Sequence, residues 1–100
     1  MTKLKLTGLR INEKDIRRIC RDYLRLKGWF VFHLLQGLGC YPGLTDLVAV
    51  KNGQVLFIEL KRPGKNIQSD PQKEFQSKIE LAGGMYILVD SLEGIIEVVG

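Results

Sequence analysis

Apolar residues recur along the chain with two different spacings, which predict where its helices and strands lie. From residue 12 to residue 27 the spacing is three or four residues, typical of one buried face of a helix. The apolar positions on this face are Ile16, Ile19, Cys20, Tyr23 and Leu24. Asn12 is suited to cap the start of this helix, and Gly28 is suited to end it.

A second helix is expected over residues 69–82. Ser69 and Gln72 stand in the positions of a capping box at its start, and Gly83 follows its end. Gln72 also shares the apolar face of this helix with Phe75. Its position therefore leaves room for two roles, one as a capping residue and one at the sheet on which the helix packs.

Five segments that are β-branched, aromatic or alternating in polarity predict strands. They span residues 29–35, 46–50, 54–61, 85–89 and 95–99. Asn52-Gly53, between the second and third segments, is the strongest short hairpin signal. The order of elements, α-β-β-β-α-β-β, predicts an α/β (α+β) fold with a mixed central sheet flanked by helices. A short edge strand or ordered arm is also expected over residues 3–7.

The predicted hairpin brings two acidic residues together. If Asn52 and Gly53 form the whole loop, counting back along both strands places Asp46 opposite Glu59. Directly opposed residues have Cβ atoms about 4.5–5.5 Å apart, and like charges at this distance are destabilising. Lys61 projects on the same side of its strand as Glu59, because it lies two residues further along.

A divalent cation would relieve the repulsion between these acids, and carboxylate oxygens suit Mg²⁺ or Mn²⁺. With Lys61 placed to orient a water molecule or to stabilise negative charge on a phosphate, the cluster is suited to phosphodiester hydrolysis. The alternative is that Glu59 and Lys61 are exposed charges at a strand end and that Asp46 only begins a strand. The two-residue loop favours the first interpretation, because a three-residue loop would shift the pairing.

Glu13 lies on the apolar face of the first helix, three positions before Ile16. A carboxylate directed at the sheet needs a partner there. Glu13 is therefore either a third carboxylate of the metal site or an acid stabilised by the dipole of the first helical turn.

Two groups of basic residues are candidates for binding phosphates. They are Arg18, Arg21 and Arg25 on the first helix, with Lys14 in line and Arg17 beside them, and Arg62 and Lys65 in the loop after residue 61. The helical group could bind a nucleic acid or be solvated, and the loop could contact a phosphate backbone or be a mobile connector.

Composition and charge mainly exclude other classes of protein. The 100 residues carry a net charge of +4, which fits one small basic domain over residues 1–100. Cys20, Cys40 and His33 are too few and too scattered for a structural zinc site, so Cys20 is expected to be a reduced core thiol and His33 a packed or edge residue. Without a membrane-spanning run or signal peptide, we expect a cytoplasmic protein that binds no membrane and no small-molecule cofactor.

Together, these residues resemble the VRR-NUC branch of the PD-(D/E)xK nucleases, over about residues 13–99. The resemblance rests on Gly43-Leu44-Thr45-Asp46, Ile58-Glu59-Leu60-Lys61, Ser69-Asp70-Pro71-Gln72, Phe75, Gly83-Gly84 and a late valine-rich segment. Thr45 departs from the family pattern, which usually has proline before the aspartate. This substitution removes a rigid φ angle but leaves the carboxylate.

The resemblance implies a restriction-endonuclease-like core of order α-β-β-β-α-β that holds Mg²⁺ or Mn²⁺. The implied site residues are Asp46, Glu59 and the backbone carbonyl of Leu60 at the metal, Lys61 at the attacking water, Glu13 as the first-helix acid and Gln72 as the supporting glutamine.

Stand-alone members of the family, many from phages, look like Holliday-junction resolvases in being small dimers that cut branched DNA. We therefore expect a homodimeric, structure-selective DNA endonuclease in the cytoplasm of a bacterial or phage-infected cell. A chain of this size would recognise DNA by phosphates and shape, and a two-fold dimer would act on two strands. The alternatives are the same chemistry on flaps, single strands or RNA, and a basic nucleic-acid-binding module that does not cut.

Overall fold

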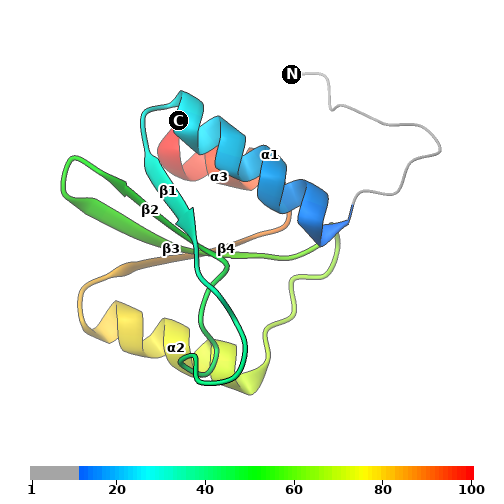
Figure 1. Cartoon of the computed structure of the whole chain (residues 1–100), viewed down its shortest axis with the longest axis vertical. Coiled ribbons are helices and arrows are strands. Elements are labelled where there is room, and N and C mark those ends of the chain that lie inside the picture. Colours follow the sequence, from blue (N-terminus) through cyan, green and yellow to red (C-terminus); the bar gives the residue numbers. More distant parts are fainter. Residues whose placement is uncertain (1–11) are drawn as a thin grey trace.

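A computed structural model describes residues 12–100, which form one four-stranded sheet with helices on both faces (Figure 1). The elements in chain order are α1 (Glu13–Leu26), β1 (Phe30–His33), β2 (Leu47–Lys51), β3 (Gln54–Leu60), α2 (Asp70–Leu81), β4 (Met85–Val89) and α3 (Leu92–Val99). The predicted α+β class is confirmed. The arm expected over residues 3–7 lies outside the described residues.

The strands lie in the order β1-β2-β3-β4, so the sheet is mixed, as predicted. The β1–β2 and β2–β3 pairs are antiparallel, whereas β3 and β4 are parallel. Parallel neighbours need a crossover connection, and α2 supplies it. In Figure 1, α1 and α3 lie against one face of the sheet and α2 lies against the other, where it packs on β4.

The core lies between α1, α3 and the sheet. Ile16, Cys20 and Leu24 of α1 are buried, as their helical spacing predicts, and pack with buried residues of all four strands. Burial, together with a smaller effect of the charge of Glu93, raises the pKa of the Cys20 thiol to about 12. Cys20 is therefore an unreactive core thiol, as expected from the sequence.

Residues 95–99 were predicted to be a strand, and this prediction is wrong because they belong to α3. Ser91 caps this helix by accepting a hydrogen bond from the Gly94 N–H at 3.2 Å. Ile95 is fully buried in the core, Val99 packs against the core four residues later, and Val98 is 42% exposed. A four-residue spacing of inward residues fits a helix, so packing outweighs the strand preference of these β-branched residues.

None of the described helices is long and apolar enough to cross a membrane.

Candidate active site

The β2–β3 hairpin has the two-residue loop predicted from the sequence. Asn52 and Gly53 both have positive φ, 50° and 80°, as a type I′ turn requires. Lys51 pairs with Gln54 next to the loop, and the pairing continues in the predicted register to the far end of β2. The hairpin register is therefore confirmed.

Asp46 lies just before β2, where the regular pairing ends. Its N–H donates to the carbonyl of Ile58 at 3.1 Å, and its carboxylate accepts the N–H of Leu60 at 2.8 Å. Both contacts hold Asp46 across the end of β3, where Glu59 lies. Leu60 itself is fully buried, and its carbonyl as a metal ligand stays a prediction.

Three carboxylates meet at this end of the hairpin. Glu13, Asp46 and Glu59 each offer an oxygen, and these three oxygens lie within 4.8 Å of one another. Asp46 is 8% exposed and Glu59 is 2% exposed. Glu13 reaches them from the first turn of α1, so its face of the helix is the one directed at the sheet. Buried like charges are costly unless a cation or a proton compensates them.

The two oxygens of Glu59 differ in their surroundings. Oε2 accepts a hydrogen bond from Gln72 Nε2 at 3.0 Å and lies 3.5 Å from Lys61 Nζ. Oε1 is buried and has no hydrogen-bond partner within residues 12–100. The pKa of Glu59 is raised to about 7, mainly by burial and also by the charge of Asp46, with Lys61 opposing the rise. A buried oxygen without a partner beside two further carboxylates fits a hard divalent cation.

Gln72 connects the start of α2 to the acidic cluster. Its Oε1 accepts the N–H of Ser69 at 2.9 Å, which completes the capping box, and also accepts from Lys61 Nζ at 3.0 Å. Its Nε2 donates to Glu59. The side chain therefore caps α2 and holds Lys61 and Glu59 in position. Gln72 thus lies both at the helix cap and at the sheet, the two places that the sequence left open to it.

The basic residues predicted from the sequence differ in their partners and exposure. Arg18 is largely exposed and lies 4.0 Å from Asp15, whereas Arg21 lies 3.0 Å from Asp22. Arg25 donates to the carbonyl of Val31 at 3.2 Å. Arg62 and Lys65 are exposed in the loop that follows β3. A role in binding nucleic acid stays a prediction for all of Arg18, Arg21, Arg25, Arg62 and Lys65.

Arg17 was expected only to lie beside the basic residues of the first helix, yet it faces the candidate site. Its Nη2 lies 3.8 Å from Asp46 Oδ1, so it faces the acidic cluster. Arg17 follows Glu13 by four residues, which places both side chains on one face of α1. That spacing is the signal that could have found it.

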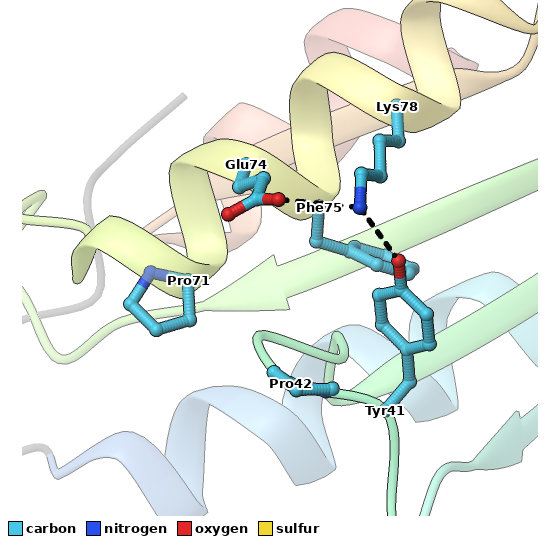
Figure 2. A pocket seen from close by; sticks show the side chains of 6 residues that line it. All are labelled: Tyr41, Pro42, Pro71, Glu74, Phe75 and Lys78. Atoms are coloured by element: carbon cyan, nitrogen blue, oxygen red, sulfur yellow. Dashed lines mark hydrogen bonds and ion pairs between the residues drawn. The ribbon is translucent and has the colours of Figure 1, made fainter.

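The loop between β1 and β2 packs against α2 and borders two hollows. The first, about 220 Å³ in volume, lies between Tyr41 and the side of α2 (Figure 2). Lys78 closes it by donating to the Tyr41 hydroxyl at 3.0 Å, while Tyr41 and Phe75 have ring centroids 5.7 Å apart. The second, about 270 Å³, is lined partly by Gln72 and therefore adjoins the acidic cluster.

Gly43 fixes this loop to the start of α2. Its φ is 79°, and a Cβ built on it would overlap the carbonyl group of Pro71. Gly43→Ala is therefore expected to lower the free energy of unfolding by at least about 3 kcal/mol, through left-handed strain and overlap with the backbone. Urea unfolding followed by circular dichroism measures this change.

Gly39→Ala is the matched control for Gly43→Ala. Gly39 has a φ of 89° but open space around its Cβ position. Gly39→Ala is therefore expected to lower the free energy of unfolding by about 1 kcal/mol only, through left-handed strain. Equal losses of stability in the two variants would show that the approach of Gly43 to Pro71 is unimportant.

Comparison with known proteins identifies the fold. No family model matches the sequence, and no curated protein matches it significantly. A solved "VRR_NUC domain" has a TM-score of 0.72 and 20% identity, covering 87% of this chain and 92% of its own. A solved "VRR_NUC domain protein" has a TM-score of 0.75 and 16% identity, covering 91% of this chain and 87% of its own. The chain thus has the fold of the VRR_NUC domains, as its sequence resemblance predicted.

Proposed function

We propose that the protein is a metal-dependent nuclease that hydrolyses phosphodiester bonds in DNA. One observation carries this proposal: the carboxylates of Glu13, Asp46 and Glu59 converge within 4.8 Å beside Lys61 and Gln72. The likeness to VRR_NUC domain structures supports it. A structural role alone does not account for three clustered acids, two of them buried, because their mutual repulsion costs stability.

Mg²⁺ or Mn²⁺ is the cofactor that this donor set suits best. Asp46 and Glu59 would hold the ion, with the carbonyl of Leu60 and the carboxylate of Glu13 completing its surroundings. The partnerless Glu59 Oε1 supports this assignment. A divalent ion bound here would supply positive charge at the reacting phosphate and lower the pKa of a water molecule.

Lys61 would orient the attacking water and stabilise negative charge on the phosphate. Its ammonium group has three N–H donors, one directed at Gln72 Oε1 and another near Glu59 Oε2. One donor is left for the water or for a phosphate oxygen. Because Gln72 is itself held by the cap of α2, Lys61 is held in position by the start of that helix.

Branched DNA is the substrate that we propose, with cleavage selective for structure instead of sequence. The net charge of +4 and the exposed basic side chains support phosphate contacts. The proposed contacts are Arg18, Arg21, Arg25, Arg62 and Lys65. We propose that the enzyme acts in the cytoplasm of a bacterial or phage-infected cell, and its two free cysteines suit a reducing compartment.

A homodimer is part of the same proposal. Phe30, Val50 and Val55 are neighbours across three strands on the face that α2 only partly covers, and Phe30 is 67% exposed. Such an apolar patch suits an interface with a second copy of the chain. Sedimentation at micromolar concentration is expected to show a dimer, and an 11.3 kDa species alone would refute it.

A cleavage time course tests the proposed function. A four-way junction and a linear duplex of the same sequence are incubated with Mg²⁺, with Mn²⁺ and with EDTA. We expect the junction to be cut faster than the duplex, only with a metal ion. Faster cutting of a flap, a single strand or RNA would assign a different substrate to the same chemistry. No cutting of any substrate would refute the enzymatic function and leave a binding module.

A further inference from the structure

Arg17 lies beside the acidic cluster and has no close hydrogen-bond partner among residues 12–100. Its Nη2 is 3.8 Å from Asp46 Oδ1, which is longer than a hydrogen bond to a carboxylate. Its Nε is buried and has no hydrogen-bond partner within the described residues. Within the part of the chain that the structure describes, the guanidinium therefore has N–H donors at the site that make no hydrogen bond.

Asp46 Oδ1 is the atom for which two cations would compete. The other oxygen, Oδ2, accepts the N–H of Leu60 at 2.8 Å and is directed at the backbone of β3. Oδ1 is therefore the oxygen left for a divalent ion shared by Asp46 and Glu59, and it is also the oxygen that faces Arg17. The positive charge of Arg17 partly neutralises Asp46 in the free protein, and an ion in the cluster would take over that function.

Arg17 also stands at the inner end of a row of arginines on α1. Arg21 and Arg25 follow at intervals of four residues, on the same side of the helix. Desolvation lowers the pKa of His33, at the end of the edge strand β1, and the charges of all three arginines lower it further, while Asp46 opposes them. The row leads from the edge of the sheet to the acidic cluster and would present positive charge to a phosphate chain.

We propose that Arg17 binds the phosphate group that is cleaved, and that it gives up its contact with Asp46 when a divalent ion binds. This inference rests on the proposed nuclease function. The planar guanidinium can donate two parallel hydrogen bonds to phosphate oxygens. The ammonium group of a lysine is a compact point charge and cannot reproduce this paired geometry. Arg17 would thereby assist metal-dependent cleavage while competing weakly with the metal in the free enzyme.

Calorimetric titration of Mn²⁺ into the DNA-free protein tests the competition. Arg17→Gln is expected to bind Mn²⁺ about threefold more tightly than the wild type, because a partly exposed ion pair has been removed. Arg17→Lys, which keeps the charge, is expected to bind Mn²⁺ like the wild type. Weaker Mn²⁺ binding by Arg17→Gln would mean that Arg17 only holds Asp46 in place, and would overturn the inference.

DNA binding supplies the second test. The fluorescence anisotropy of a labelled junction is measured with Mn²⁺ in a Lys61→Ala background. In this background, the further substitution Arg17→Gln is expected to weaken binding of the junction about tenfold. This is the effect of losing a hydrogen bond to a charged group. With Lys61 intact, Arg17→Lys is expected to slow cleavage about tenfold. Full rescue by lysine, or unchanged DNA affinity in Arg17→Gln, would overturn the inference.

Lys51→Gln is the matched control for these variants. It removes one positive charge at the far end of β2 from Asp46, where Lys51 Nζ donates to the carbonyl of Lys27 at 2.7 Å. It is expected to change Mn²⁺ and DNA affinity less than twofold. A wild-type protein that neither binds Mn²⁺ nor cuts DNA would refute the nuclease function itself. Wild-type cutting together with weaker Mn²⁺ binding by Arg17→Gln would refute only the role of Arg17.

Discussion

Lys61→Ala is expected to slow DNA cleavage by about a thousandfold, while DNA affinity changes less than threefold. The magnitude is that of losing one positioned group that moves or holds a proton at the reacting centre. Lys61 is only 18% exposed and is held by Gln72 and Glu59, so it contributes little to the outer surface that first meets DNA. Single-turnover cleavage of a junction in Mg²⁺ gives the rate, and anisotropy gives the affinity.

Lys73→Ala is the control for this variant, since it removes an exposed lysine from α2, one residue from Gln72. We expect its cleavage rate to stay within twofold of the wild type. If Lys61→Ala and the wild type cut equally fast, the catalytic role of Lys61 is wrong. If the variant loses binding and cleavage in equal proportion, Lys61 serves to attract the phosphate instead of acting on the attacking water.

The hairpin at the centre of the site could be predicted because its register depends on two residues only. Asn52 and Gly53 favour the type I′ turn, and the turn determines which residues of β2 and β3 face each other. The sequence could not show that Asp46 leaves the ladder and turns its carboxylate to the Leu60 N–H. That detail depends on the chain that arrives from Gly43 and on its packing against α2.

For the helices too, some features follow from the spacing of residues along the chain, whereas others depend on packing that the sequence alone does not show. The position of Glu13 on the inner face of α1 follows from helical spacing alone. Arg17 shares that face four residues later, but its approach to Asp46 could not be predicted, because it depends on how α1 packs on the sheet. Ile95 and Val99 share the inner face of α3, yet a run of β-branched residues fits a strand equally well in isolation.

Glu59→Gln is expected to stabilise the metal-free protein and to abolish its response to metal. In EDTA at pH 8, the free energy of unfolding should rise by about 1–3 kcal/mol, because the change removes a buried negative charge that the fold disfavours. Cleavage should fall by at least about a thousandfold, since a ligand for the ion is lost. Thermal unfolding with and without Mg²⁺ measures the stability, and the junction assay measures cleavage.

The expected stabilisation by Glu59→Gln follows from how the stability of the wild type depends on pH. The pKa of Glu59 rises from 4.5 to about 7 on folding. The metal-free wild type should therefore be most stable, with respect to this group, below pH 4.5, and should lose that contribution as the pH rises to about 7. Glu59→Gln should lack this fall, whereas Glu97→Gln, which removes an exposed acid on α3, should retain it.

Metal ions should make the wild type more stable than Glu59→Gln, the reverse of the order expected in EDTA. Mg²⁺ that binds only the folded state stabilises the wild type in proportion to its occupancy, while the Glu59→Gln variant should gain little. A variant that is less stable than the wild type in EDTA would show that the ionised carboxylate supports the fold through Lys61 and Gln72. The expected result, greater stability with lost activity, would show instead that the acidic cluster reduces stability in the free protein because its carboxylates are arranged to hold a cation.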